Sequence, residues 1–329
     1  MRILITGGAG YIGSLLSAEL LRDGHEVVVL DDLLFGGDSI LALLPNPRFH
    51  FLKRDVSESD LNGSIQNMDA VVHLAAIVGY PACDAVGEER ARQINTEATI
   101  RIFDAAESAG VERFIFASTY SNYGIARDDK PVDEEAELFP QSVYAQTKIA
   151  AEQYLRTRAR DSRCAPVIPR FATLFGISPR TRFDLLVNQF VLEALTTRRL
   201  VIFQGNYTRA FVHVRDVVRA LRELLVAPAG TVRGEIFNVG SESMNFTKRQ
   251  VVDLICEAVP GTEVEVRDVS FGGDMRDVAL DCTKIRQRLG FVPEIGIPEG
   301  IAEVRDAITS GLISEPQSPR YRNHVRMIP

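Results

Sequence analysis

The sequence has no tryptophan, and among its 329 residues it has few cysteines and histidines. The four cysteines are Cys83, Cys164, Cys256 and Cys282, and none of them forms a C-x-x-C pair. They are too scattered for a disulfide framework, so we interpret them as buried thiols and expect a cytoplasmic location. The five histidines lie far apart in the sequence, so we expect no metal site.

The chain also lacks a long apolar run and a block of positive charge. Its hydrophobic segments fall short of the roughly 20 residues that a membrane-spanning helix needs, so we expect no membrane partner. The formal net charge is −7, and without a basic segment we expect no nucleic-acid partner. Apolar residues make up 46% of the chain, which is enough for a large core or two lobes.

A glycine pattern stands near the N-terminus, between a predicted strand and a predicted helix. Residues 1–6 form a short apolar strand, and residues 7–13 read GGAGYIG. This run satisfies G-x-G-x-x-G from Gly8 and G-x-x-G-x-x-G from Gly7. Such glycines let the backbone approach a pyrophosphate at the N-terminus of the following helix, which we expect at about 11–21. A glycine-rich turn of another α/β fold is the alternative.

An acidic pair follows the second predicted strand, residues 26–30. Asp31 lies 18 positions after Gly13, near the spacing expected for the acid that binds an adenosine ribose. Its carboxylate would accept hydrogen bonds from ribose hydroxyls and repel a 2′-phosphate. No arginine occurs in residues 32–37. We therefore predict NAD rather than NADP as the cofactor.

Strand and helix patterns alternate through the first half of the chain. Further strands are predicted at 49–52, 70–76, 113–118 and near 167–168, and a long helix is predicted at about 89–109. Parallel strands joined by helical crossovers are covered on both faces. We therefore predict an α/β fold with a Rossmann-type, doubly wound parallel sheet.

After about residue 171 the pattern loosens. We expect a helix at about 184–195, a return toward the sheet at 211–218 with a helix to Leu225, and then further elements. The latter are predicted at 247–258, 263–266 and 284–289, with an irregular tail from 313 to 329. This predicts a smaller, discontinuous α/β substrate lobe. The predicted domains are 1–172 plus about 211–240 for NAD, and 173–210 plus 241–329 for the substrate.

Tyr144 and Lys148 stand four residues apart in a segment that favours a helix, residues 142–152. They share a helix face, so phenol and ammonium can point into one site. A nearby cation favours the phenolate, which makes the tyrosine usable as a base near neutral pH. A packed ring and a solvated lysine are the more common reading of this spacing alone.

With these motifs together, the chain resembles the extended short-chain dehydrogenase/reductase family, and within it the nucleotide-sugar epimerases and dehydratases, such as UDP-glucose 4-epimerases. The resemblance covers nearly the whole chain. The segments that carry it are Thr6–Gly13, Asp31-Asp32, His73–Ala76, Ala117–Gly124, Tyr144–Lys148 and Arg209–Asp216.

The resemblance implies roles for particular residues. Tyr144 is similar to the proton-transfer residue, Lys148 to the group that holds the nicotinamide ribose, and Thr119 to the hydroxyl that bonds the reacting sugar oxygen. The implied cofactor-binding residues are Gly7, Gly10, Tyr11, Ile12, Gly13, Asp31, Asp32, Asp55, Val56, Leu74, Ala75, Ala76, Asn95, Ser118, Tyr144 and Lys148. The implied substrate-binding residues are Val78, Gly79, Thr119, Tyr120, Ser121, Asn188, Arg209 and Arg276, with Arg209 on a diphosphate.

The chain departs from the family's 4,6-dehydratases next to Thr119. Those enzymes follow the threonine with an Asp-Glu pair that removes water, whereas Tyr120 and Ser121 stand here. Hydride and proton transfer at one carbinol remain possible without elimination. The implied activity is therefore an NAD-dependent nucleotide-sugar epimerase, most simply at C4 through a 4-keto intermediate.

Two alternatives to the epimerase remain open. One is a reductase of a nucleotide-linked 4-keto-(6-deoxy)hexose, which uses the same residues and consumes NAD(P)H. The other is a non-catalytic cofactor-binding regulator, although such a protein has no need of an activated phenol. The resemblance also implies a homodimer, and the expected partner is a nucleoside diphosphate-sugar.

Overall fold

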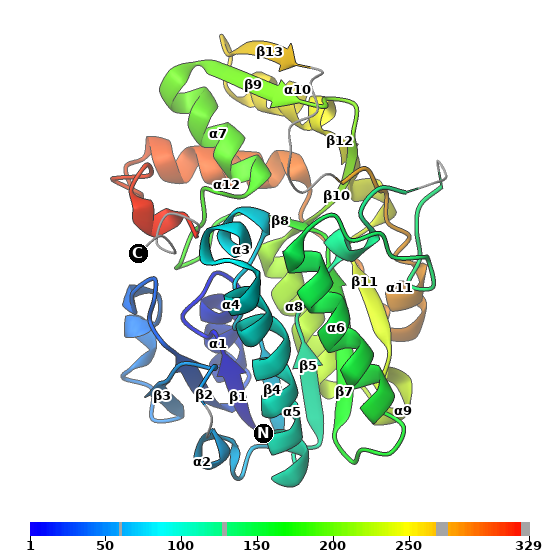
Figure 1. Cartoon of the computed structure of the whole chain (residues 1–329). Coiled ribbons are helices and arrows are strands. Elements are labelled where there is room, and N and C mark those ends of the chain that lie inside the picture. The colour runs from blue at the N-terminus through cyan, green and yellow to red at the C-terminus, as the bar shows by residue number, and fades with distance from the viewer. Residues whose placement is uncertain (59–60, 127–129, 268–275, 324–329) are drawn as a thin grey trace.

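The structure is a computed structural model of the chain, and it describes residues 1–58, 61–126, 130–267 and 276–323. A large domain with a central sheet lies below a smaller lobe in Figure 1. Segments from both halves of the sequence contribute to the large domain, whereas the core of the smaller lobe comes from the second half.

In the described residues the main sheet has eight strands, all of them parallel. Its order is β3-β2-β1-β4-β5-β7-β11, and β6 pairs with β7 at one end. The strands are β1 (Arg2–Thr6), β2 (Glu26–Asp31), β3 (Phe49–Lys53), β4 (Ala70–His73), β5 (Arg113–Phe116), β6 (Ser118–Thr119), β7 (Ala165–Phe171) and β11 (Ile236–Val239). The order reverses between β1 and β4, which confirms the predicted doubly wound sheet.

Helices cover both faces of this sheet, and each face has its own apolar core. On one face lie α1 (Gly13–Arg22), α8 (Val214–Val226), α9 (Ala229–Val232) and α11 (Thr283–Leu289). On the other lie α2 (Asn62–Ile65), α5 (Ala98–Ser108) and α6 (Val143–Arg158). The inner strands β1, β2 and β4 are largely buried on both sides and are made mostly of apolar residues. The edge strand β3 is only partly buried.

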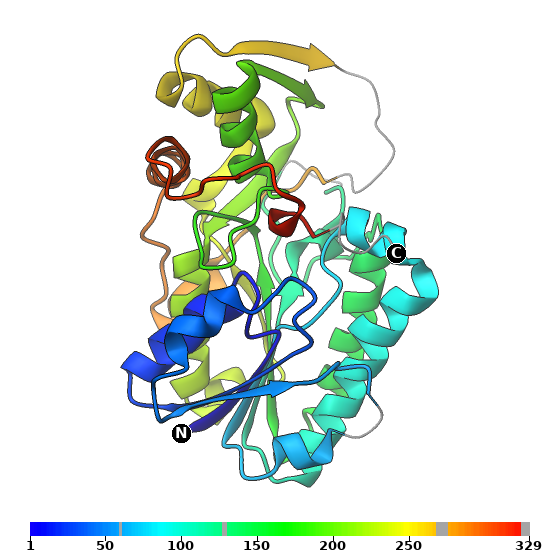
Figure 2. The same cartoon turned by 90° about the vertical axis from the view of Figure 1, so that its left-hand side faces the viewer.

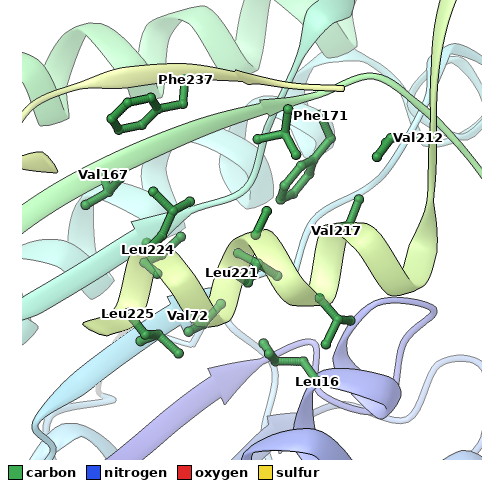
Figure 3. Packing of buried hydrophobic residues seen from close by; sticks show 14 of the residues in the cluster. Leu16, Val72, Val167, Phe171, Val212, Val217, Leu221, Leu224, Leu225 and Phe237 are labelled. Atoms are coloured by element: carbon green, nitrogen blue, oxygen red, sulfur yellow. The ribbon is translucent and has the colours of Figure 1, made fainter. Parts of the chain in front are cut away.

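Helix α8 shows how the pattern of a helix fixes its position. Val217, Leu221 and Leu224 recur at the spacing of one helix face and are fully buried. Figure 3 shows these three side chains in the same apolar cluster as Val72 of β4 and Leu16 of α1. Full burial of each such side chain contributes about 1.5–3 kcal/mol, so α8 is held firmly against the sheet.

The predicted long helix at 89–109 is present but is not a uniform α-helix. It consists of α4 (Glu88–Arg92), a π-helical turn η2 (Gln93–Glu97) and α5, after the short helix α3 (Tyr80–Val86). A π turn inserts one extra residue into the helix and re-aims the side chains there. Sequence periodicity predicts the helix but not the turn, because one inserted residue changes the apolar spacing very little.

The smaller lobe has a separate apolar core. Its helices are α7 (Leu186–Thr197), α10 (Lys248–Ala258) and α12 (Ile297–Thr309), and its parallel pair of strands is β9 (Arg199–Phe203) and β13 (Glu263–Arg267). A three-stranded sheet joins the lobe to the large domain, with β8 (Thr173–Phe175), β10 (Thr208–His213) and β12 (Asn245–Thr247). The chain also forms short 3₁₀ helices: η1 (Asp38–Leu43), η3 (Tyr120–Tyr123), η4 (Glu242–Met244) and η5 (Pro319–Tyr321).

Two predictions about the second half of the chain need correction. Residues 211–213 do not return to the main sheet, because β10 pairs with β8 and β12, and α8 starts at Val214. Residues 278–291 do not belong to the substrate lobe, because Val278, Leu280 and Ile285 lie in the core beside α8.

The helix α12 was not predicted at all. Pro298 and Gly300 disfavour a helix by local propensity, but Pro298 stands in the first turn, where proline is tolerated. Ile297, Ile301 and Val304 are fully buried in the core of the lobe, so packing outweighs propensity. Within the described residues no helix is both long enough and apolar enough to span a membrane.

Candidate active site

A pocket of about 1190 Å³ lies at the carboxyl ends of the strands and is lined by both lobes. Gly7 follows β1, Asp31 ends β2, Leu74 follows β4 and Ala117 follows β5, and all four line it. Ligands of open α/β sheets bind in this position, outside the strand ends where the order reverses. The described residues contain no cluster of three His, Cys, Asp or Glu side chains that could hold a metal ion.

The glycines at one end of the pocket are required by space. A Cβ on Gly7 would lie 2.7 Å from the backbone nitrogen of Ala75, and one on Gly13 would lie 2.4 Å from the carbonyl oxygen of Gly7. Gly7 also has a φ of +71°, which side-chain-bearing residues rarely adopt. We call Gly7, Gly10 and Gly13 the glycine cradle. With the N-terminus of α1 beside it, the cradle fits a dinucleotide pyrophosphate.

Asp31 lies at the same end of the pocket. Its Oδ2 accepts a hydrogen bond from the backbone N–H of Ala9 at 3.0 Å, and its Oδ1 accepts one from Leu33 at 2.9 Å. Burial raises the pKa of the Asp31 carboxyl, while these two bonds and the charge of Arg180 act against that rise. The other residues predicted for the cofactor here also line the pocket: Gly10, Tyr11, Ile12, Asp32, Asp55, Val56, Leu74, Ala75 and Ala76.

Arg180 was missed by sequence reasoning. Its guanidinium lies 4.1 Å from the ring centroid of Phe35, and both residues line the pocket. It comes from the loop after β8, about 150 residues beyond Asp31 along the chain. No local sequence pattern links Arg180 to Asp31, because only the tertiary fold brings the two segments to one pocket.

Tyr144 and Lys148 lie one turn apart at the start of α6, where Ser142 caps the helix by accepting from the Ala145 N–H at 3.3 Å. Both line the pocket and are almost fully buried. The Lys148 ammonium donates to the carbonyl of Ala117 at 2.8 Å. Burial lowers the pKa of Lys148 to about 8, against the opposing effects of Cys83 and Glu152. Tyr144 and Lys148 therefore line the same pocket, as the helix spacing predicted.

Thr119 lies opposite this helix and is the first of a chain of hydroxyls. Its Oγ1 donates to Ser121 Oγ at 3.0 Å, and Ser121 Oγ also accepts from the Arg276 guanidinium at 3.0 Å. The Tyr120 hydroxyl is bonded to Thr173 Oγ1 at 2.6 Å. The four predicted residues of this group line the pocket: Thr119, Tyr120, Ser121 and Arg276. Neither Tyr120 nor Ser121 carries a carboxylate, and both hydroxyls are held in place by neighbours.

Ser118 lines the pocket, but its hydroxyl is committed elsewhere. It donates to Glu152 Oε1 at 2.5 Å, and Glu152 forms a buried ion pair with Arg170 at 2.6 Å. Asn122 donates to the same carboxylate at 2.9 Å. The Ser118 hydroxyl therefore supports α6 through Glu152, and because Ser118 also lines the pocket, its contact with the cofactor stays a prediction.

Two predicted asparagines do not line the pocket. Asn95, in the π turn, is fully buried; its amide accepts from the Ile77 N–H at 2.8 Å and donates to the Ile77 carbonyl and to Thr147. It supports the loop after β4 and does not contact the cofactor. Asn188 is also fully buried, with its amide bonded to both backbone groups of Gly176. The expectation that Asn188 contacts the substrate is therefore corrected, because no polar atom of its side chain remains for a ligand.

Three cations meet at the other end of the pocket, and we call them the basic cluster: Arg209, Lys248 and Arg276. Burial, together with the charges of Arg209 and Arg276, lowers the pKa of Lys248 to about 8. Such mutual repulsion is relieved by an anion with more than one charge. Lys248 was not predicted, although the Thr247–Gln250 capping box that places it at the start of α10 is visible in the sequence. Val78 and Gly79 line the pocket between the two ends.

Comparisons with known proteins identify the family. The model of the NAD dependent epimerase/dehydratase family matches residues 3–240. The chain belongs to this family. Its cofactor is NAD, as the family's name and the position of Asp31 both indicate.

Both enzyme classes of the family are among its relatives. The UDP-glucose 4-epimerase of Mycolicibacterium smegmatis is 32% identical over 316 residues, covering 92% of this chain and 97% of the relative. The dTDP-glucose 4,6-dehydratase of Streptomyces niveus is 29% identical over 317 residues, covering 92% and 91%. The crystal structure of the Thermotoga maritima UDP-glucose 4-epimerase with UDP-glucose has a TM-score of 0.83 at 28% identity, covering 95% of this chain and all of that one.

Proposed function

We propose that this protein is an NAD-dependent nucleotide-sugar epimerase that acts at C4 through a transient 4-keto intermediate. The observation that carries the proposal is that one pocket holds the glycine cradle, the Thr119, Tyr144 and Lys148 group, and the basic cluster. The relatives named as UDP-glucose 4-epimerases support the same activity.

The proton transfer follows from the positions of three side chains. Tyr144 removes the proton of the C4 hydroxyl, and the Lys148 ammonium one turn away favours the phenolate before that step. The Thr119 hydroxyl bonds the reacting oxygen and holds it toward the phenol. The glycine cradle and Asp31 would hold NAD, which would supply the redox chemistry, uptake of the carbinol hydride and its return to the opposite face of the keto-sugar.

The basic cluster holds the diphosphate while the sugar turns over. Arg209 and Lys248 come from β10 and α10 of the smaller lobe, so the anchor lies apart from the catalytic helix α6. A fixed diphosphate and a roomy sugar site allow the keto-sugar to present its other face without leaving the pocket. The negative charges of a bound diphosphate would also offset the repulsion of Lys248 by Arg209 and Arg276, which contributes to its lowered pKa.

Elimination of water is disfavoured by the residues beside Thr119. The resemblance to the dehydratases would require an acid and a base at positions 120 and 121. Tyr120 donates to or accepts from Thr173, and Ser121 accepts from Thr119 and Arg276. A serine hydroxyl and a buried phenol at these positions supply neither a carboxylate base nor a carboxylic acid.

The 4-keto-sugar reductase remains the second candidate, because the same three residues serve ketone reduction. Product analysis by NMR and mass spectrometry decides between the candidates. We expect UDP-glucose or another nucleoside diphosphate-sugar to be interconverted with its C4 epimer, without net change in NADH absorbance. A product lighter by one water would establish a dehydratase, and stoichiometric loss of NADH with a 4-keto-sugar would establish the reductase.

We also propose that the protein is a cytoplasmic homodimer. The family resemblance supports the dimer, and the scattered, unpaired cysteines support a reducing compartment. Sedimentation equilibrium tests the dimer, since a monomer mass at micromolar concentration would exclude it. Fractionation of cells tests the location.

A further inference from the structure

A short segment near the C-terminus, Pro319–Asn323, lies against the pocket, and we call it the strap. It follows α12 and crosses from the smaller lobe toward the large domain, as the red chain in Figure 2 shows. Its last two residues, Arg322 and Asn323, line the pocket. The sequence suggested only an irregular tail here, and residues 324–329 of that tail lie outside the described part.

The strap is fixed by contacts that do not use the Asn323 side chain. The backbone N–H of Phe183 donates to the carbonyl of Tyr321 at 2.9 Å, and the two rings pack edge-to-face with centroids 5.5 Å apart. The backbone N–H of Asn323 donates to Asp184 Oδ2 at 2.8 Å. The Asn323 side chain is therefore positioned by its neighbours without contributing to the anchors.

Asp184 also forms a two-bond ion pair with Arg182, at 2.9 and 3.2 Å. Their side chains are 12% and 11% exposed, and both residues line the pocket. Desolvation opposes the charged form of Asp184, but the attraction of Arg182 outweighs it and holds the pKa of Asp184 below its usual value. Arg182 in turn interacts electrostatically with Tyr11 and Tyr144. The pair therefore lies at the catalytic end of the pocket.

The Asn323 side chain has an unused acceptor in this position. The residue is only 6% exposed, and its Oδ1 has no hydrogen-bond partner among the described residues. Buried amide oxygens are nearly always paired, because leaving one without a donor costs free energy. An acceptor that is buried, aligned by its backbone and next to a catalytic pocket is suited to a donor on a ligand.

We propose that the strap and the Arg182–Asp184 pair form a sugar-recognising wall of the pocket, in which Asn323 Oδ1 accepts a hydrogen bond from a hydroxyl group of the substrate sugar. The inference rests on the proposed function. Because Asp184 neutralises Arg182, this wall suits an uncharged, hydroxyl-bearing ring better than a second anionic group. Asn323 is thus a specificity-determining residue that reads the sugar, whereas the basic cluster reads the diphosphate.

The test uses the full-length protein with Asn323→Leu, which keeps the size of the side chain and removes the acceptor. Gln317→Leu is the matched control, because it makes a similar amide-to-alkyl change at an exposed position just before the strap. Calorimetry measures the binding of UDP-, dTDP-, GDP- and CDP-glucose, of the four free diphosphates, and of NAD. Asn323→Ala repeats the measurement with a smaller side chain in case leucine disturbs folding.

We expect Asn323→Leu to weaken binding of the recognised nucleotide-sugar about tenfold, as for the loss of a hydrogen bond that leaves a donor unpaired. Binding of the free diphosphate and of NAD should change less than about twofold, and Gln317→Leu should change none of them. Equal weakening of diphosphate and nucleotide-sugar, or loss of NAD alone, would overturn the inference, because the strap would then serve another ligand. Unchanged sugar binding in both Asn323 variants would overturn it as well.

Failure of the proposed function has a different signature. If the unmodified protein bound none of the four nucleotide-sugars, the epimerase proposal would fall and this inference with it. If the unmodified protein bound one of them and the Asn323 variants bound it equally well, only the inference would fall.

Discussion

Tyr144 is the residue on which the proposed chemistry depends most directly. We expect Tyr144→Phe to lose about 10²- to 10⁴-fold in turnover, the usual contribution of a general acid or base. NAD content should stay close to that of the parent, because the glycine cradle and Asp31 are separate from the phenol. Steady-state kinetics and the nucleotide released on denaturation measure the two quantities. Near-normal turnover in the variant would refute the assignment.

Asp31 and Arg180 together bear on cofactor choice. Asp31→Ala should raise the affinity for NADP relative to NAD, because the carboxylate that repels a 2′-phosphate is gone while Arg180 remains nearby. In the double variant with Arg180→Ala, that gain should largely disappear. Fluorescence titration with NAD and with NADP, after removal of any bound nucleotide, measures both affinities in the single and the double variant. Tighter binding of NADP than NAD by the parent would contradict the role given to Asp31.

The pH dependence of the reaction separates two buried lysines, since burial lowers the pKa of both Lys148 and Lys248 to about 8. A lysine with a lowered pKa loses its charge as pH rises through about 8. Lys148 then no longer favours the phenolate, so kcat should fall above about pH 8. Lys248 then no longer attracts the diphosphate, so KM should rise in the same range.

Arginine replacements distinguish the two lysines, because a guanidinium stays charged throughout this range. Lys148→Arg should move the alkaline fall of kcat to higher pH, and Lys248→Arg should do the same for the rise of KM. Profiles of kcat and KM from pH 6 to 10 provide the measurement. Alkaline limbs that stay in place in both variants would show that other groups control them.

At the scale of elements, the π turn η2 joins three parts of the site. Asn95 in this turn bonds the N–H and the carbonyl of Ile77, in the loop after β4, and also Thr147 of α6. Asn95→Ala should lower the free energy of unfolding by about 3 kcal/mol or more, because two buried backbone groups lose their partner. Urea titration measures it. Gln153→Ala, on the exposed side of α6, should change it by less than about 0.5 kcal/mol.

At the scale of the whole molecule, the pocket joins a cofactor end in the large domain to a diphosphate end in the smaller lobe. Each ligand should stabilise the folded protein by about 2.7 kcal/mol at a hundredfold excess over its Kd. Arg209→Met should weaken diphosphate binding by about 1.5–3 kcal/mol and leave stabilisation by NAD intact. Thermal unfolding with NAD, with UDP and with both measures these effects. Loss of the NAD effect in Arg209→Met would show that the two ends are not separate.

Local patterns in the sequence determined the doubly wound sheet, the glycine cradle and the pairing of Tyr144 with Lys148. These features depend on spacing within one strand, one turn or one helix, and such spacing is written directly in neighbouring residues. Thr119 and Arg209 were found through resemblance, which also depends on short continuous motifs.

Only the tertiary structure decided the rest of the site. The charge of Arg180 acts on Asp31, and that of Arg209 acts on Lys248, although each pair is far apart in the sequence. The strap likewise places Asn323 against Asp184. Asparagine side chains such as those of Asn95 and Asn188 can bind a ligand, yet here their amides form hydrogen bonds with buried backbone groups. The sequence around each of these residues does not predict its partner, because the partner is a distant group that comes close only when the chain folds.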